Sequence, residues 1–239
     1  MLLIAGDVPS RALVVAPDSG SADETLAAIP HPADVTLFSR AGAVQSATLP
    51  TVSGEGLCAT GELTSAPPPR NWSVGFIGGV VSPLPIDSAA SPADSAALAV
   101  WLNRLASALP NDTAGRFVGL PFVAHGLWRV HIPDGPLVVI GSLVRQINQE
   151  ATPLQERTII VAEQVPSDSS FVTAYSERFY GPEETIETTE VLAGALLGAS
   201  RTPTLVVSRD FGDGVAYGTI ERIGEGRWRA RWTSGVRSC

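Results

Sequence analysis

The chain has 239 residues, a formal net charge of −8 at pH 7, and sixteen arginines but no lysine. The missing lysine excludes functions that need an ε-ammonium group, such as a P-loop phosphate site, a Schiff base to a carbonyl or pyridoxal cofactor, and a serine–lysine dyad. The acidic balance argues against general nucleic-acid binding, which needs a basic face. The use of arginine alone is typical of a GC-rich bacterial genome.

Residues 1–64 are predicted to be a small β-rich unit, because short apolar runs alternate with turn residues along it. Ser21–Glu24 is a capping-box pattern, which predicts a helix of about two turns. Residues 35–49 contain two strand-like runs around a glycine-bearing loop, which predicts a hairpin. Three consecutive prolines then predict an extended linker over residues 65–70.

Residues 71–239 are predicted to form a larger domain with one long helix and a series of strands. Ser91 and Pro92 predict the start of the helix, since Ser is a favoured N-cap and Pro a favoured first residue, and an apolar stripe continues to about Ala108. The hydrophobic pattern then changes to period two, which is typical of strands. The five strands predicted next are Phe117–Val123, Leu127–Ile132, Leu137–Ile147, Thr158–Val165 and Phe171–Tyr180.

The last fifty residues are predicted to add a helix and three strands. A run of glutamates suits the start of a helix, and we place that helix at 188–199. Glycine-rich loops at 210–214 and 224–226 predict hairpin turns. The three strands around these loops are predicted at Leu205–Arg209, Val215–Ile223 and Arg227–Thr233.

These elements predict an α+β fold that is predominantly an antiparallel β-meander with two or three short helices. We expect three segments along the chain: the small β-rich unit (1–64), the Pro-rich linker (65–70) and the helix-plus-meander domain (71–239).

Arginine and tryptophan alternate along residues 227–232, and this is the clearest surface pattern of the chain. Because alternate side chains of a strand point to opposite faces, both tryptophans are predicted to face the core and the arginines to face outward. Such a row can dock a carboxylate-rich partner or an anionic headgroup through bidentate contacts. The arginine face has no aromatic side chain for base stacking, so nucleic acid is kept only as the third and least expected partner. The predicted binding residues are Arg222, Arg227, Arg229, Arg231 and Arg237.

A simpler interpretation of the same row is a solvated outer face whose guanidinium groups pair with acidic residues such as Glu221. Taken alone, the row favours this second interpretation. Its use as a docking surface therefore depends on the wider composition of the chain.

The two cysteines, Cys58 and Cys239, allow one disulfide, and a bond that closes so long a loop would contribute about 4–5 kcal/mol. Two cysteines are nevertheless too few to indicate an oxidising compartment. We therefore favour free thiols and keep the pair as the disulfide candidate.

No catalytic or metal-binding residues are predicted, and no cofactor is expected. His31, His125 and His131 do not have metal-ligand spacing, so we interpret them as structural. Ser142 with His125 could form a serine hydrolase only across the fold, and Ser142 lies in a predicted strand instead of the strand-to-helix turn of a nucleophile elbow.

The composition favours a non-enzymatic binding or assembly subunit of a larger complex. Only 17 % of residues are charged and the mean hydropathy is +0.19, which indicates apolar surface that faces a partner. The partner is expected to be a protein, with peripheral membrane contact through the arginines as an extension. The alternative is a hydrolase or small-ligand carrier with a pocket between the meander and the helix at 92–108.

The longest apolar runs, 73–81 and 136–144, are about half of the roughly 20 residues that a membrane-spanning helix needs, so no such helix is expected. The first residues lack the features of a signal peptide. We expect a cytoplasmic protein if Met1 is the true start, and a periplasmic or extracellular one if an upstream signal was lost.

Overall fold

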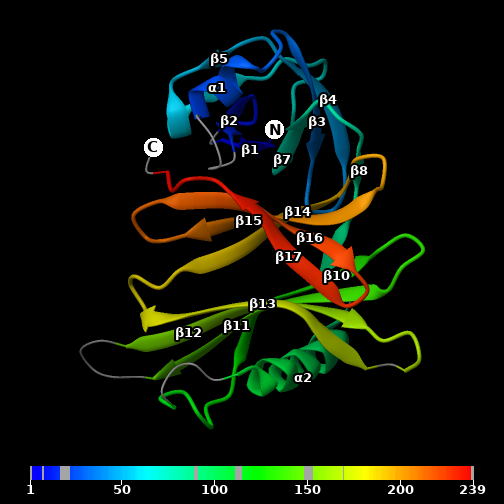
Figure 1. The fold of residues 1–239 in the computed structure, drawn as a ribbon, viewed down its shortest axis with the longest axis vertical. Coiled ribbons are helices and arrows are strands. Elements are labelled where there is room, and N and C mark those ends of the chain that lie inside the picture. The colour runs from blue at the N-terminus through cyan, green and yellow to red at the C-terminus, as the bar shows by residue number, and fades with distance from the viewer. Residues whose placement is uncertain are drawn as a thin grey trace.

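The computed structural model describes residues 2–6, 8–16, 22–88, 91–110, 115–147, 153–168 and 170–237. These residues form three antiparallel sheets stacked one on another, and a long helix covers the far face of the last sheet (Figure 1). We call them the first, middle and outer sheets. Predominantly antiparallel β-structure was predicted and is confirmed.

The first sheet has seven strands in the order β4-β3-β7-β1-β2-β6-β5. The same part of the chain contains helix α1 (Ala22–Ala27) and the 3-10 turn η1 (Gly56–Cys58). Helix α1 corresponds to the short helix predicted from the pattern at 21–24, in which Ser21 lies outside the described residues. The predicted hairpin at 35–49 is β3–β4. The strands are β1 (Leu2–Ala5), β2 (Arg11–Val15), β3 (Ala33–Phe38), β4 (Val44–Leu49), β5 (Val52–Ser53), β6 (Thr60–Glu62) and β7 (Val74–Ile77).

The middle and outer sheets have five strands each. The middle sheet, in the order β17-β16-β15-β14-β8, contains β8 (Val81–Pro83), β14 (Thr188–Leu197), β15 (Thr202–Asp210), β16 (Val215–Gly224) and β17 (Arg227–Thr233). The outer sheet, in the order β13-β12-β11-β10-β9, contains β9 (Ile86–Ser88), β10 (Val123–His131), β11 (Leu137–Ile147), β12 (Leu154–Gln164) and β13 (Phe171–Pro182). Helix α2 (Pro92–Ala108) packs on the outer sheet.

The segment 74–88 passes through all three sheets, because β7, β8 and β9 lie in the first, middle and outer sheet respectively. The predicted linker at 65–70 therefore does not end the first sheet, since β7 follows the prolines and pairs with both β1 and β3. The first sheet draws strands from both sides of the linker.

A buried apolar cluster lies on each side of the middle sheet. Between the first and middle sheets, Phe38 and Phe76 pack with Val206. Between the middle and outer sheets, Ile140 and Val161 pack in a cluster that includes Leu205 and Ile220 on the middle sheet. The middle sheet is thus buried on both faces, and burial of this apolar surface is the main stabilising term of the stack.

Burial on both faces explains why the helix predicted at 188–199 is wrong. That region forms strand β14, whose residues 191–196 are mostly buried on both sides of the sheet. A strand with two covered faces has a continuous apolar run, and periodicity alone cannot distinguish such a run from a buried helix. The predicted α+β class with two or three helices is corrected accordingly, since α2 is the one long helix of the described residues.

The predicted strand at Phe117–Val123 is also wrong. Residues 115–119 form turns, with Gly115 and Gly119 at positive φ, and β10 begins only at Val123. The predicted five-stranded meander is consequently four long strands, β10 to β13, with β9 added at its edge.

The prediction of α2 is confirmed. The Ser91 hydroxyl accepts a hydrogen bond from the Asp94 backbone N–H at 3.2 Å, as an N-cap does.

Arg40 connects the three sheets at one point. It lies in the β3–β4 turn of the first sheet, and its Nη2 is 2.6 Å from Oε1 of Glu190 on β14. The same guanidinium lies 5.5 Å from the ring centroid of Trp128 on β10, which is cation–π geometry. The sheets are therefore held in place by polar contacts as well as by their cores.

Candidate functional site

The predicted arginine row lies on β17, an edge strand of the middle sheet. Arg227, Arg229 and Arg231 are all exposed. Among the described residues the row makes one ion pair, between Arg231 Nε and Glu221 Oε2 at 3.9 Å, and 60 % of the Arg231 side chain stays exposed. An exposed pair at this separation contributes little energy, so the three guanidinium groups are available to another molecule. We call Arg227, Arg229 and Arg231 the arginine strip.

The alternation predicts that both tryptophans of this strand lie on one face, and this prediction is wrong. Trp232 pairs with Thr219 but Ala230 pairs with Ile220, so Arg231 forms a β-bulge. One inserted residue reverses the side to which the next side chains point. Trp228 is buried between the middle and outer sheets, whereas Trp232 packs on the other face, against the cluster shared with the first sheet.

Arg222 and Arg237 were predicted as binding residues, but neither belongs to the strip. Arg222 forms a bidentate ion pair with Glu163 on β12 of the outer sheet. Arg237 is 6 % exposed and donates to the backbone oxygens of Val14 and Ala59, at 3.3 and 3.4 Å. Burial lowers the pKa of the Arg237 guanidinium. Both side chains hold sheets together.

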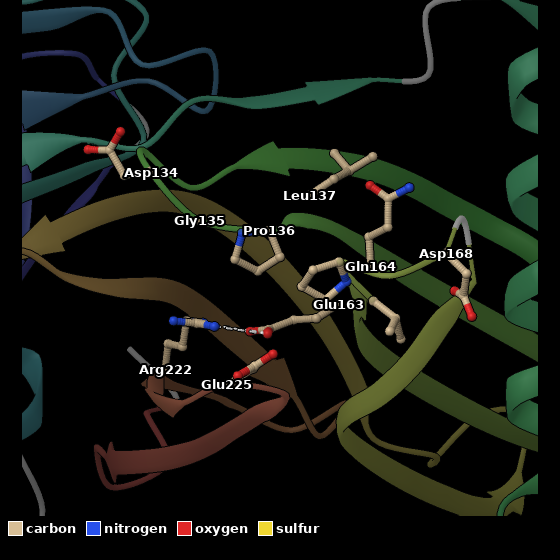
Figure 2. Close-up of a pocket in the computed structure, with 11 residues that line it drawn as sticks. Asp134, Gly135, Pro136, Leu137, Glu163, Gln164, Asp168, Arg222 and Glu225 are labelled. Carbon is tan, nitrogen blue, oxygen red and sulfur yellow. Dashed lines mark hydrogen bonds and ion pairs between the residues drawn. The ribbon is translucent and has the colours of Figure 1, made fainter.

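Glu163 is a buried carboxylate with four hydrogen-bond donors (Figure 2). Arg222 donates from Nε at 2.7 Å and from Nη2 at 3.0 Å, the Gly226 backbone N–H donates at 2.8 Å, and Trp228 Nε1 donates at 2.6 Å. Burial by itself raises the pKa of Glu163, but the bonds from Arg222, Gly226 and Trp228 outweigh it and hold the pKa below 4.5. The carboxylate is thus fixed in its charged form.

A cavity of about 580 Å³ opens beside Glu163, where three hairpin turns meet. The exposed carboxylates of Asp134, Asp168 and Glu225 line it, and Figure 2 shows them around the Glu163–Arg222 pair. No serine, threonine or cysteine belongs to its described lining. A general base needs a pKa near the working pH, so Glu163 has the wrong environment for that role.

The opposite end of the core between the middle and outer sheets is closed by a second polar cluster. Glu177 on β13 accepts hydrogen bonds from the Tyr175 hydroxyl and from Arg209 on β15, and Glu187 lies 3.6 Å from Arg209 Nε. Burial raises the pKa values of Tyr175 and Glu187. With Glu163 at one end and Arg209 at the other, ion pairs join the two sheets on both sides of their shared core.

The histidines and Ser142 do not form a catalytic arrangement among the described residues. His31, His125 and His131 are exposed. Ser142 lies beside Arg157 and Thr188 in a narrow crevice between the middle and outer sheets. His125 lies at a bulge of β10, and the structure gives no hydrogen bond between it and Ser142. The hydrolase hypothesis thus finds no paired nucleophile and base in this part of the chain.

The sequence analysis missed a buried charge cluster under α2. Glu156 on β12 is fully buried and lies between Arg145 on β11 and Arg178 on β13. The Arg145 Nη2 to Glu156 Oε2 distance is 2.8 Å, and the Arg178 Nε to Glu156 Oε1 distance is 3.1 Å. A second cavity, of about 320 Å³, lies against both arginines. Arg145 interrupts an apolar strand sequence, a signal that could have indicated buried pairing, whereas Glu156 lies in a polar run of β12 that gives no such signal.

Cys58 is disulfide-bonded, so the expectation of a free thiol is corrected for this residue. The one other cysteine of the sequence, Cys239, lies outside the described residues. The nearby segment is anchored in its own right, because Ala59 accepts a hydrogen bond from buried Arg237.

We expect Cys58→Ser to lower the free energy of unfolding by about 2–5 kcal/mol, which is the range typical for removal of a native disulfide. Urea denaturation measures the loss. Treatment of the wild-type chain with dithiothreitol should produce the same shift, whereas the variant should not respond to it. Titration of Cys58 as a free thiol in the unreduced, denatured chain would contradict the assignment.

Comparisons of this chain with protein family models, with curated proteins and with solved structures gave no match. Over the residues that the structure describes, no helix is both long enough and apolar enough to span a membrane. The fold and its surfaces therefore define the class: a protein of three stacked antiparallel sheets with an exposed row of arginines on an edge strand.

Proposed function

We propose that the protein is a non-enzymatic binding and assembly subunit that docks on an acidic surface of a larger complex through the arginine strip. The observation that carries the proposal is three exposed guanidinium groups on one strand, with only a long, exposed ion pair among them. Planar guanidinium groups bind carboxylates in bidentate fashion, so a carboxylate-rich protein segment is the favoured partner.

The strand that carries the strip is rigidly held. Trp228 is 5 % exposed and donates to Glu163, and the β16–β17 turn is anchored because Gly226 N–H donates to the same carboxylate. A fixed strand does not have to be ordered when a partner binds, so only the side-chain entropy of the arginines is lost. The arginines are therefore carried on a preorganised backbone.

The edge of this strand favours docking through side chains over addition of a partner strand. A bulge at Arg231 interrupts its pairing, and charges and bulges are devices that blunt sheet edges. Ile223 in the same hairpin and Val172 near its turn are 48 % and 44 % exposed, and they add apolar area next to the charges. Arginines beside apolar residues are a typical composition for an interface.

The strip also differs in sign from the chain as a whole, which has a net charge of −8. Long-range repulsion would keep acidic partners away from most of the surface, so attraction at the strip would orient their approach. An anionic membrane surface offers similar chemistry and is the outcome that competes with a protein partner in the test.

We expect the triple variant R227Q/R229Q/R231Q to bind the partner about threefold to a hundredfold more weakly, since each exposed ion pair contributes roughly 0.2–1 kcal/mol and three are lost. The matched control is R11Q/R104Q/R201Q, which removes three exposed arginines elsewhere and the same total charge. Capture from native cells with quantitative mass spectrometry compares both variants with the wild type.

A protein that the wild type and the control capture, and that the strip variant loses, supports the proposal. Equal capture by both variants contradicts the proposal. It is also contradicted if the strip variant captures the same proteins as the wild type and loses only its binding to anionic lipid vesicles. A second candidate function, a small-ligand carrier, is favoured by one observation: the cavity at the C-terminal end of α2.

A further inference from the structure

We propose that the cavity below the C-terminal end of α2 binds a small carboxylate with a short apolar tail. Its wall is formed by the end of α2, by residues 118–121 and by the side chains of Arg145 and Arg178. The inference rests on the ligand-carrier candidate and names its ligand class, and since the cavity shares no residue with the arginine strip it does not depend on the proposed docking function.

The charge of the site is the first argument. Arg145, Arg178 and Glu156 are 7 %, 12 % and 0 % exposed, so two buried positive charges face one buried negative charge. Both arginines line the cavity, whereas Glu156 does not and lies behind them. An uncompensated buried charge is costly. Among the described residues, these three side chains carry a net formal charge of +1, which the backbone oxygens at the end of α2 offset only in part, and an anion would neutralise the rest.

The second argument is that donors remain on both guanidinium groups. Each group carries five N–H donors. Arg145 donates to the Phe117 backbone oxygen at 2.7 Å and to Glu156 at 2.8 Å, and its buried Nε has no hydrogen-bond partner. Arg178 donates to the backbone oxygens of Pro110 and Ala106. These bonds fix both groups in position and use one N–H of each Nη atom, so the second N–H of each Nη is left for a ligand.

The rings around Arg145 complete this fixation. Its guanidinium carbon lies 5.5 Å from the centroid of Phe117 and 4.6 Å from that of Phe122. A guanidinium that is held by rings and by backbone oxygens loses little rotamer freedom when it binds a planar carboxylate. The floor of the cavity is therefore preorganised for this group.

The apolar residues of the cavity wall favour a hydrocarbon chain on the rest of the ligand. Leu109, Val118, Leu120 and Pro121 line the cavity and are apolar. The volume of about 320 Å³ has room for roughly ten groups of the size of water. One surplus charge matches a monoanion better than a phosphate dianion. These features together select a short-chain carboxylic acid in its ionised form.

Titration calorimetry with hexanoate tests the proposal at pH 7. We expect hexanoate to bind, and 1-hexanol, hexylamine and inorganic phosphate to bind at least tenfold more weakly. Hexanol tests whether the ligand needs a charge, and hexylamine tests whether that charge must be negative. Phosphate tests whether the site prefers a monoanion. No heat of binding with millimolar hexanoate, or equal affinity for phosphate or hexanol, overturns the proposal.

Val118 at the cavity wall offers a matched pair of variants, since its 66 % exposure means that polar replacements need not disturb the fold. We expect Val118→Glu to weaken hexanoate binding at least tenfold by charge repulsion, and Val118→Gln, of the same size, to stay within about twofold of the wild type. Val80→Glu adds the same charge at an exposed site in the β7–β8 turn and should have no effect. Equal binding by the Glu and Gln variants at position 118 overturns the proposal.

Discussion

Replacement of Glu163 by alanine is expected to lower the free energy of unfolding by about 3–5 kcal/mol, or on the order of 10 °C in Tm. The carboxylate accepts four hydrogen bonds from Arg222, Gly226 and Trp228, and the variant leaves all of these donors without an acceptor. A donor that is buried and unpaired costs more than the bond contributed. Thermal and urea denaturation measure the loss.

Glu225→Ala is the matched control, because Glu225 lines the same cavity but is exposed. We expect it to change the free energy of unfolding by less than about 0.5 kcal/mol. Similar losses in the two variants would show that Glu163 contributes through general charge and not through its bonds, and the interpretation of Glu163 as a structural anchor would be wrong.

The effect of Glu163 should also depend on pH in a defined direction. The folded chain holds the pKa of Glu163 below 4.5, the ordinary value that applies to the unfolded chain. The unfolded chain therefore takes up the proton more readily, so this stabilisation is fully present above about pH 4.5 and is lost as the pH falls through the folded pKa. We expect the difference in stability between the wild type and Glu163→Gln to shrink over that acidic range.

Local patterns of the sequence predicted some elements correctly. The Ser91 cap of α2 and the turns at 210–214 and 224–226 depend on a few neighbouring residues, and the structure contains all three. Exposure of Arg227 and Arg229 follows from simple alternation along a strand. Such features need only the chain within a few residues of each position.

Other features depend on contacts that the sequence does not display. Arg222 looks like a surface arginine beside the strip, but its partner Glu163 is 59 residues away along the chain. The partner of Arg237 is even more distant, at Val14. The bulge at Arg231 is set by the register with β16, so alternation within β17 could not reveal it. In the middle sheet, β14 was mispredicted as a helix because burial on both faces removes the period-two pattern from its sequence.

Replacement of Glu156 by methionine is expected to lower the free energy of unfolding by about 3–5 kcal/mol, because it leaves the buried guanidinium groups of Arg145 and Arg178 without their shared counter-charge. Methionine keeps a similar volume, so the loss reports charge more than a cavity. Arg178 of this cluster also donates to backbone oxygens at the end of α2. We therefore expect faster amide hydrogen exchange at that end of the helix in the variant.

A double-mutant cycle separates charge from packing at this cluster. Glu156→Met raises the surplus from one positive charge to two, and Arg178→Met in the same chain returns it to one. We therefore expect the double variant to be at least about 1 kcal/mol more stable than the sum of the two single losses predicts. Losses that add to within about 0.5 kcal/mol would mean that Glu156 and Arg178 act as independent packing groups, and the role of Glu156 as the counter-charge of Arg178 would lose its basis.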